Sequence, residues 1–184
     1  MMLAPSANRV YANESVSLSV AELAVCAPFA SIVRPTDVAG VPSIVFEADE
    51  LDDERRAVLA GQSNFLALLQ VAGTGDLLRP LDLADPHVLD DDLVTIPKYA
   101  GKTNEQFTRL LANVTLAAVE RPLDHGGRVV LDPLAGRGTT LSTLWRMGHH
   151  AAGVEGDEKA LEAYAAFLKS YLRRKRLKHT ADTT

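Results

Sequence analysis

The sequence has few of the residues that build disulfide frameworks, metal clusters or membrane spans. It contains one cysteine, Cys26, in 184 residues, which excludes an internal disulfide and a metal cluster built on cysteine. Its longest apolar stretches, such as residues 66–72, are far shorter than the roughly 18 residues that a membrane helix requires. The first ten residues lack the basic-then-apolar pattern of a signal peptide. We therefore expect a cytoplasmic protein with no membrane partner.

Motifs for metal binding and for serine hydrolysis are also lacking. The 5 histidines show no His-Glu-x-x-His or other ligand spacing, and no Gly-x-Ser-x-Gly turn occurs. The sequence thus predicts no metal site and no serine nucleophile. Its composition, 47% hydrophobic and 23% charged, is typical of an ordinary globular chain and excludes collagen-like and disordered proteins.

Basic residues are scarce at first and concentrated near the end. Residues 1–100 carry 6 Lys and Arg against 15 Asp and Glu, a net charge of −9, whereas residues 101–184 carry 13 against 9, a net charge of +4. A run of cations near the C-terminus is typical of contact with a polyanion, and it also suits the negative end of a helix dipole. The candidate nucleic-acid-binding residues in this run are Arg173, Arg174, Lys175, Arg176 and Lys178.

Residues 1–97 predict a small α+β domain, for which substrate binding is the expected role. Imperfect alternation over residues 17–25 and β-rich runs at 41–47 and 65–71 predict strands. Residues 51–60, which start acidic and precede Gly61, predict a short helix. The breaker-rich segment 82–97 predicts a linker, so we place a domain boundary between residues 97 and 98.

Residues 98–184 open with a predicted helix and a predicted buried strand. Thr103 and Gln106 have the spacing of a capping box, so a helix is expected from Asn104. A turn is predicted over residues 124–127. The apolar run 128–132 that follows is typical of a strand buried on both faces of a parallel sheet.

A second helix and strand complete a predicted βαβ unit. Thr139 and Thr140 are expected to cap a helix that ends before Gly148, and residues 150–155 predict the next strand. A final helix is predicted over residues 157–176. The fold class expected for the chain is therefore α/β, with this unit preceded by the smaller α+β domain.

A glycine-rich turn follows the first strand of the predicted βαβ unit. Gly136 and Gly138 let backbone amides and a helix N-terminus approach a ligand closely. Glu155 ends the next strand, 17 residues after Gly138, where a carboxylate can accept hydrogen bonds from both hydroxyls of a ribose. An adenosine-containing cofactor is the natural occupant of such a site.

The details of the turn distinguish among adenosine cofactors. No lysine follows Gly138, which disfavours a phosphate-binding loop, and Leu141 stands where a dinucleotide fingerprint has its third glycine. Asp132 would repel a pyrophosphate but attract the ammonium of an amino-acid group. These features favour S-adenosylmethionine over a nicotinamide dinucleotide.

The segment Asp132-Pro-Leu-Ala-Gly-Arg-Gly-Thr-Thr140 resembles the Asp-Pro-Phe-x-Gly-x-Gly-Thr motif of the amino-group methyltransferases that use S-adenosylmethionine. That superfamily includes the N6-adenine and N4-cytosine DNA methyltransferases and the THUMP-associated tRNA guanine-N2 methyltransferases. Residues 153–157 are similar to its second motif, whose acid holds the ribose, and residues 102–111 resemble the segment that precedes the cofactor loop. The resemblance covers about residues 98–178 and implies a partial Rossmann-like methyltransferase unit.

The resemblance also implies a function and a set of cofactor-binding residues. The implied reaction is methylation of an exocyclic amine of a nucleic-acid base. The favoured target is N2 of a tRNA guanine, so RNA is favoured over DNA as the partner. Lys98 and Tyr99 would lie near the methionine end of the cofactor. The residues implied to bind S-adenosylmethionine are Asp132, Pro133, Ala135, Gly136, Gly138, Thr139, Thr140, Glu155 and Lys102.

The chain departs from the family pattern at several points. Leu134 replaces the motif's Phe, Arg137 replaces its usual small residue, and no Asp/Asn-Pro-Pro-aromatic motif occurs, so the catalytic residues stay unassigned. We therefore expect a fragment that a further C-terminal segment or a second copy of the chain completes. The alternatives are a non-catalytic nucleic-acid or protein adaptor, a DNA adenine or cytosine amino-methyltransferase and, third, a nicotinamide-dependent dehydrogenase.

Overall fold

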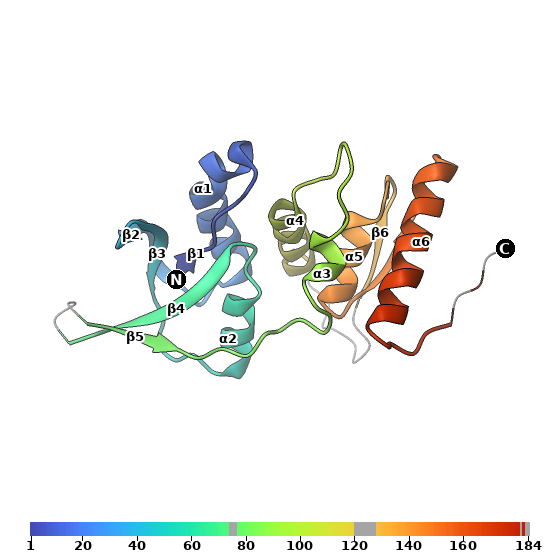
Figure 1. Cartoon of the computed structure of the whole chain (residues 1–184). Coiled ribbons are helices and arrows are strands. Elements are labelled where there is room, and N and C mark those ends of the chain that lie inside the picture. Colours follow the sequence, from blue (N-terminus) through green and yellow to red (C-terminus); the bar gives the residue numbers. More distant parts are fainter. Residues whose placement is uncertain (74–76, 120–127, 181, 183–184) are drawn as a thin grey trace. The chain divides into compact units, whose positions relative to one another are not determined.

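The computed structural model describes residues 1–73, 77–119, 128–180 and 182, which divide into two compact units (Figure 1). Unit 1 comprises Met1–His87 and the helix that follows Asn104, and unit 2 comprises Val88–Thr103 and the segment from Arg128 onward. This division differs from the predicted boundary at residue 97, because the helix after Asn104 packs within unit 1. The turn predicted over residues 124–127 lies outside the described residues.

Unit 1 is built on an antiparallel sheet with the strand order β2-β3-β1-β4-β5 in the described residues (Figure 1). The short first strand lies in the middle of this sheet, where Met2 pairs with Ser43 on one side and Ala67 on the other. The Met1 amine donates a hydrogen bond of 2.7 Å to the Ile44 carbonyl. The strands predicted at 41–47 and 65–71 are confirmed. The strands are β1 (Met2–Leu3), β2 (Ser31–Val38), β3 (Val41–Glu47), β4 (Phe65–Ala72) and β5 (Leu77–Leu81).

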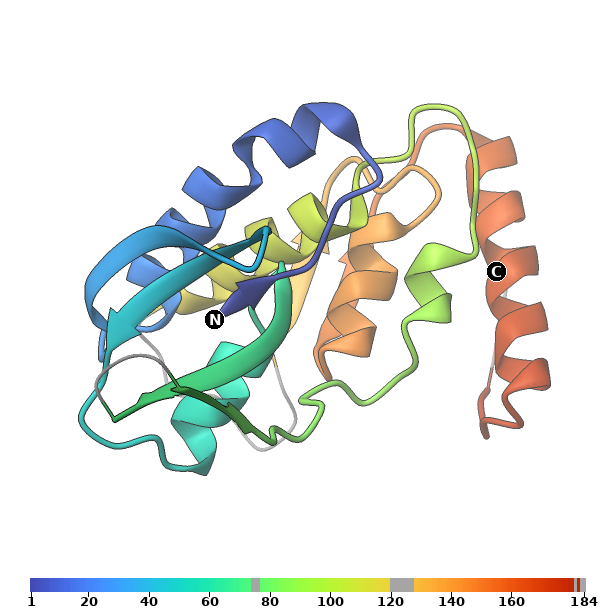
Figure 2. The same ribbon diagram turned by 60° about the vertical axis from the view of Figure 1, so that its left-hand side comes forward.

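Three helices of unit 1 lie among the described residues: α1 (Arg9–Cys26), α2 (Asp53–Ala60) and α4 (Glu105–Ala117). Helix α1 packs on β2 and β3, and α4 lies beside α1 (Figure 2). The strand predicted over residues 17–25 is wrong, because these residues continue α1. Asn8 caps that helix by accepting a hydrogen bond of 3.1 Å from the Tyr11 amide, and Leu23 and Ala27, one turn apart, are fully buried against the sheet.

A buried carboxylate joins three segments of unit 1. Glu22 of α1 is 1% exposed and accepts hydrogen bonds from the Ser63 amide (3.0 Å), the Ser63 hydroxyl (2.5 Å) and the Asn113 side chain of α4 (2.7 Å). Asn113 also donates to the Gly61 carbonyl at 2.9 Å. Burial raises the pKa of the Glu22 carboxyl, while these hydrogen bonds lower it, and the net shift is upward.

Unit 2 contains the predicted βαβ arrangement. Strands β6 (Val129–Asp132) and β7 (His150–Gly153) pair in parallel, from Val129 opposite His150 to Asp132 opposite Gly153, and α5 (Thr139–Arg146) connects them. Helix α5 packs on one face of this pair. Val129 and Leu131 are 74% and 62% exposed, so within the described residues β6 is not buried on both faces as its sequence predicted.

Two predicted caps and the predicted linker differ from the structure. Asn104, not Thr103, caps α4 through a 2.8 Å bond from the Phe107 amide. Gly138, in the left-handed conformation, precedes α5 without a side-chain capping bond. Part of the predicted linker forms α3 (Asp92–Thr95), which packs on α6 (Glu158–Arg174) because Leu93 and Tyr171 share a buried cluster.

We expect the stability of the protein to carry a pH-dependent contribution from Glu22. Because burial raises its folded pKa above the ordinary value of 4.5, the folded state binds this proton more tightly than the unfolded state. The contribution is therefore fully present below about pH 4.5 and is lost as pH rises through the folded pKa. Urea unfolding followed by circular dichroism at several pH values would measure the slope.

The matched variants are Glu22→Gln and Glu14→Gln, since Glu14 is an exposed carboxylate on the same helix. The pH-dependent contribution should disappear in Glu22→Gln and persist in Glu14→Gln. The same pH slope in Glu22→Gln as in the parent protein would contradict the assignment.

Candidate functional site

The glycine-rich loop after β6 is held against the end of β7. Gly136 and Gly138 adopt φ angles of +53° and +73°, in the left-handed region that favours glycine. The Asp132 carboxylate accepts a hydrogen bond of 3.0 Å from the Leu134 amide, which forms the turn that leaves the strand. The Ala135 amide then donates to the Val154 carbonyl at 2.9 Å. The loop geometry is therefore set by the Asp132 side chain and by the carbonyl of the residue that follows β7.

Gly138 also has a packing role. A Cβ atom at this position would fall on the ring of Tyr164, which is buried on α6. The Tyr164 ring stacks on Trp145 with centroids 6.3 Å apart, and its hydroxyl lies 3.2 Å from the Ser142 hydroxyl. Burial raises the pKa of Tyr164 to about 12, so the phenol stays protonated at neutral pH.

Glu155 connects the glycine loop with the start of α6. One of its carboxylate oxygens accepts a 2.6 Å hydrogen bond from the Gly136 amide, and the other accepts a 2.7 Å bond from the Asp157 amide. These bonds from backbone amides lower the pKa of Glu155, so the carboxylate is ionised at neutral pH. Each carboxylate oxygen has two lone pairs, so the side chain can accept further hydrogen bonds.

Glu155 and Gly136 line a cleft of about 590 Å³ within unit 2. Charges of both signs face this cleft, because its lining includes two cations and two carboxylates. Tyr99 contributes an aromatic wall: its hydroxyl lies 2.5 Å from the Thr139 hydroxyl, and the Arg137 guanidinium lies 5.2 Å from its ring centroid. The lining residues are Lys98, Tyr99, Ala100, Gly101, Gly136, Arg137, Glu155, Asp157 and Ala160.

The residues predicted to bind the cofactor fall into two groups. Gly136 and Glu155 line the cleft, and Thr139 meets a lining residue through its bond to Tyr99. The rest lie outside that lining and shape the loop, the helix start or the preceding segment. These residues are Asp132, Pro133, Ala135, Gly138, Thr140 and Lys102.

Lys102, which the resemblance implied to bind the cofactor, does not line the cleft. Its ammonium donates hydrogen bonds to the carbonyls of Val94 (2.6 Å) and Pro97 (2.9 Å), so it orders the segment before the cleft. Arg137 was not predicted to bind a cofactor, although it stands between the two glycines of the loop. Its place between two glycines was the available signal, because it is the one long side chain in the segment Gly136-Arg137-Gly138.

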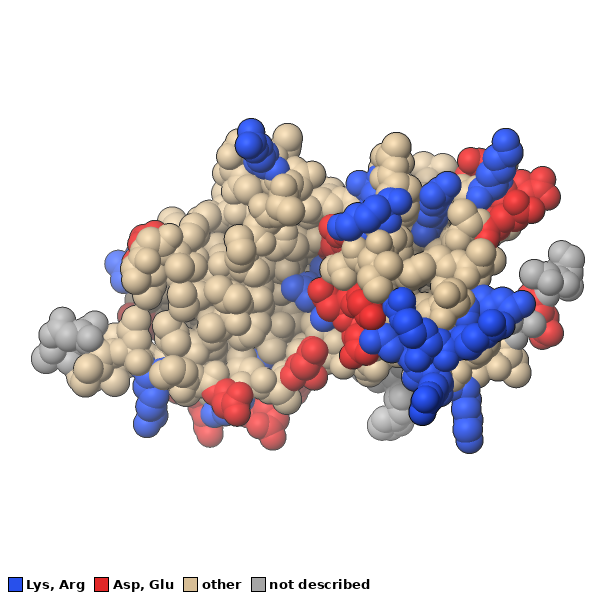
Figure 3. All heavy atoms as spheres, viewed as in Figure 1, with Lys and Arg blue, Asp and Glu red and all other residues tan. Residues whose placement is uncertain are grey.

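Part of the C-terminal cationic run is occupied by acidic partners within unit 2. The Lys175 ammonium lies 2.6 Å from Asp90 and 2.9 Å from Asp92, and these contacts raise its pKa. Arg174 lies 3.4 Å from Asp92. Figure 3 shows Lys and Arg side chains gathered toward the C-terminal end of α6. Within the described part of the chain, Arg173, Arg176 and Lys178 form no ion pair with an acidic side chain.

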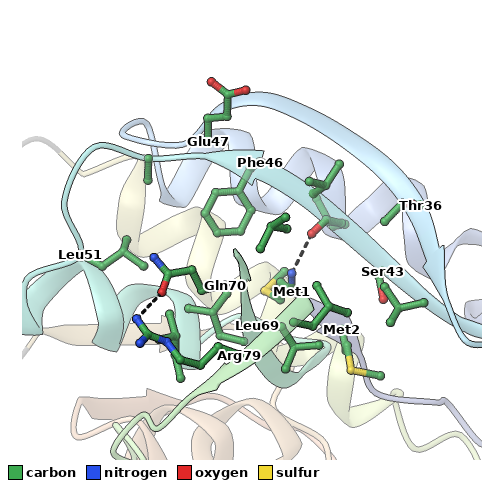
Figure 4. A pocket seen from close by; sticks show the side chains of 18 of the residues that line it. Met1, Met2, Thr36, Ser43, Phe46, Glu47, Leu51, Leu69, Gln70 and Arg79 are labelled. Carbon is green, nitrogen blue, oxygen red and sulfur yellow. Dashed lines mark hydrogen bonds between the residues drawn. The ribbon is translucent and has the colours of Figure 1, made fainter. Parts of the chain in front are cut away.

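A larger hollow of about 1010 Å³ lies in unit 1 (Figure 4). Side chains from the strands line it, among them Met2 and Leu69. Two exposed polar side chains on its rim, Arg79 and Gln70, are joined by a 2.7 Å hydrogen bond that Arg79 donates. None of the predicted cofactor-binding residues lines this hollow, whereas Gly136 and Glu155 line the cleft of unit 2, so the cleft is the candidate site.

Neither a metal centre nor a membrane span is found among the described residues. No group of three or more His, Cys, Asp or Glu side chains there is arranged to hold a metal ion. No helix in the same residues has the length and apolarity needed to cross a membrane.

Comparisons of the chain with protein-family models, with curated proteins and with solved structures found no match.

We expect Gly138→Ala to destabilise unit 2 more than Gly136→Ala. Both substitutions place a side chain at positive φ, which costs about 1–2 kcal/mol, but only Gly138 faces a ring that a methyl group would overlap. Thermal unfolding followed by the fluorescence of Trp145, the single tryptophan, reports on this unit. Replacing Tyr164 by Leu in the Gly138→Ala background should recover part of the loss. Equal losses for the two alanine variants would contradict the packing role.

Proposed function

We propose that unit 2 binds S-adenosylmethionine in the cleft between the glycine loop and Glu155, and that the protein acts in methyl transfer. The observation that carries this proposal is the ionised Glu155 carboxylate, two residues after the end of β7, hydrogen-bonded to the glycine loop that follows the neighbouring parallel strand. Ligands of open parallel sheets bind beyond the carboxyl ends of the strands, which is where this carboxylate lies.

The residues of the cleft suit an adenosine with an amino-acid group. Glu155 keeps lone pairs for two ribose hydroxyls after it has accepted the amides of Gly136 and Asp157. A volume of about 590 Å³ is within the range of small-molecule sites. The cations and carboxylates around the cleft match a ligand that carries charges of both signs. When bound, S-adenosylmethionine supplies an electrophilic methyl group on its sulfonium.

The proposed methyl acceptor is an exocyclic amine of a nucleic-acid base, with tRNA guanine favoured. This part rests on the resemblance of residues 132–140 to the amino-group methyltransferases. Cations at the C-terminal end of α6 would contact phosphates, and of these Arg173, Arg176 and Lys178 are the available ones. No residue is assigned to hold the amine, because the sequence contains no Asp/Asn-Pro-Pro-aromatic motif.

We expect the protein to bind S-adenosylmethionine and S-adenosylhomocysteine in preference to NAD. Replacing Glu155 by Ala should weaken binding about tenfold or more, because hydrogen bonds to a charged group contribute roughly 1.5–3 kcal/mol. Titration calorimetry measures both expectations. Glu162→Ala, which removes an exposed carboxylate outside the cleft, is the matched control and should bind as the parent does.

Two results would overturn the proposal. One is no binding of S-adenosylmethionine by the parent protein, and the other is an unchanged affinity in Glu155→Ala. A thermal unfolding curve of Glu155→Ala shows whether the loop has collapsed, and Glu155→Gln, which keeps an acceptor oxygen, should lose less affinity than Glu155→Ala.

We further expect tRNA binding to depend on the cations without acidic partners. The double variant Arg173→Gln, Arg176→Gln should weaken binding and lower the slope of log K against log salt by about 2, one for each lost phosphate contact. The double variant Arg174→Gln, Lys175→Gln should have a smaller effect, because these side chains already pair with Asp90 and Asp92. Salt-independent binding, or the reverse order of effects, would remove α6 from the interface.

A further inference from the structure

We propose that Arg137 is a specificity-determining residue of the cleft and that its guanidinium binds the carboxylate of the ligand's amino-acid group. This inference rests on the proposed function and adds to it the group that recognises the anionic end of the ligand. The exposed side chain of Arg137 leaves the glycine loop and lines the cleft.

The Arg137 side chain lies over the ring of Tyr99, and the hydroxyl of Tyr99 is hydrogen-bonded to Thr139. Its guanidinium lies 5.2 Å from the Tyr99 ring centroid, a cation–π distance. The Tyr99 hydroxyl lies 2.5 Å from the Thr139 hydroxyl at the start of α5. A guanidinium that rests on a fixed ring loses less freedom when it binds a ligand, which favours binding.

Arg137 has no carboxylate partner among the described residues. Glu155 and Asp157 line the same cleft, but the Glu155 oxygens accept backbone amides and Asp157 accepts the Lys159 amide at 3.0 Å. Lys98 adds a second cation to the lining. The cleft thus presents an unpaired planar cation, whose fork of N–H donors matches a carboxylate in a two-bond geometry.

The groups that line the cleft therefore suit a ligand that has both hydroxyl groups and an oxyanion. The Glu155 side offers an acceptor for hydroxyl groups, and the Arg137 side offers a donor for an oxyanion. A nucleoside that carries a carboxylate has both features, and so does a nucleoside phosphate. We assign a carboxylate as the anionic group of the ligand, because Asp157 and Glu155 in the same lining would repel the larger charge of a phosphate.

The test compares two ligands that differ only in the carboxylate. S-adenosylmethionine and decarboxylated S-adenosylmethionine share the adenosine, the sulfonium and the ammonium. Titration calorimetry of the full chain should show that the parent protein prefers the carboxylated ligand by roughly tenfold or more. Arg137→Gln should lose that preference while binding the decarboxylated ligand within about twofold of the parent. Arg173→Gln, an exposed arginine outside the cleft, should keep the preference.

Each other outcome has a definite meaning. Equal weakening of both ligands in Arg137→Gln, or an unchanged preference, overturns the role of Arg137 and leaves the proposed function standing. Failure of the parent protein to bind either ligand overturns the proposed function itself. Tighter binding of adenosine 5′-monophosphate than of S-adenosylmethionine, lost in Arg137→Gln, would overturn the carboxylate assignment in favour of a phosphate. Trp145 fluorescence should give the same unfolding midpoint for Arg137→Gln and the parent, because the side chain is exposed.

Discussion

The candidate site depends on one carboxylate, Glu155, that bonds to backbone amides on both sides of it. Through Gly136 it holds the glycine loop, and through Asp157 it holds the first turn of α6. Because both partners are backbone groups, the bonds fix the path of the chain and leave the neighbouring side chains to face the cleft. The same bonds keep the carboxylate ionised, so one residue both shapes the site and supplies its main acceptor.

Polar groups also organise the rest of each unit. In unit 1 the buried Glu22 receives donors from the segment after α2 and from α4, so a single acceptor links elements that are distant in the sequence. In unit 2 Asp92, the first residue of α3, pairs with Arg174 at the end of α6, and Asp90 pairs with Lys175, the residue after α6. This pairing divides one cationic run into side chains with an internal partner and side chains available to an external one. A count of charges in the sequence cannot make that division.

Much of the candidate site could be predicted from the sequence because it is made of local geometry. The apolar run 128–132, the glycine-rich turn, the helix signals between Thr139 and Gly148 and the run 150–155 predicted a strand, a turn, a helix and a second strand. The structure contains these elements in that order. The helix over residues 17–25 was missed because an imperfect alternation favoured a strand, whereas the cap at Asn8 and the burial of Leu23 favour the helix. Burial of both faces of β6 was predicted from its composition, yet composition does not say whether a covering layer is present.

The sequence by itself determined the glycine loop, the acid after β7 and the sign of the charge on α6, since each follows from neighbours in the chain or from a short spacing. Only the tertiary structure decided the partners of these groups. It placed α4 on α1, put Tyr164 against Gly138, turned Lys102 toward the carbonyls before the cleft and left Arg137 over Tyr99. The physical reason is that an apolar stripe or a charged side chain in the sequence indicates only that it needs a partner. Which residue becomes that partner depends on packing between segments far apart in the sequence.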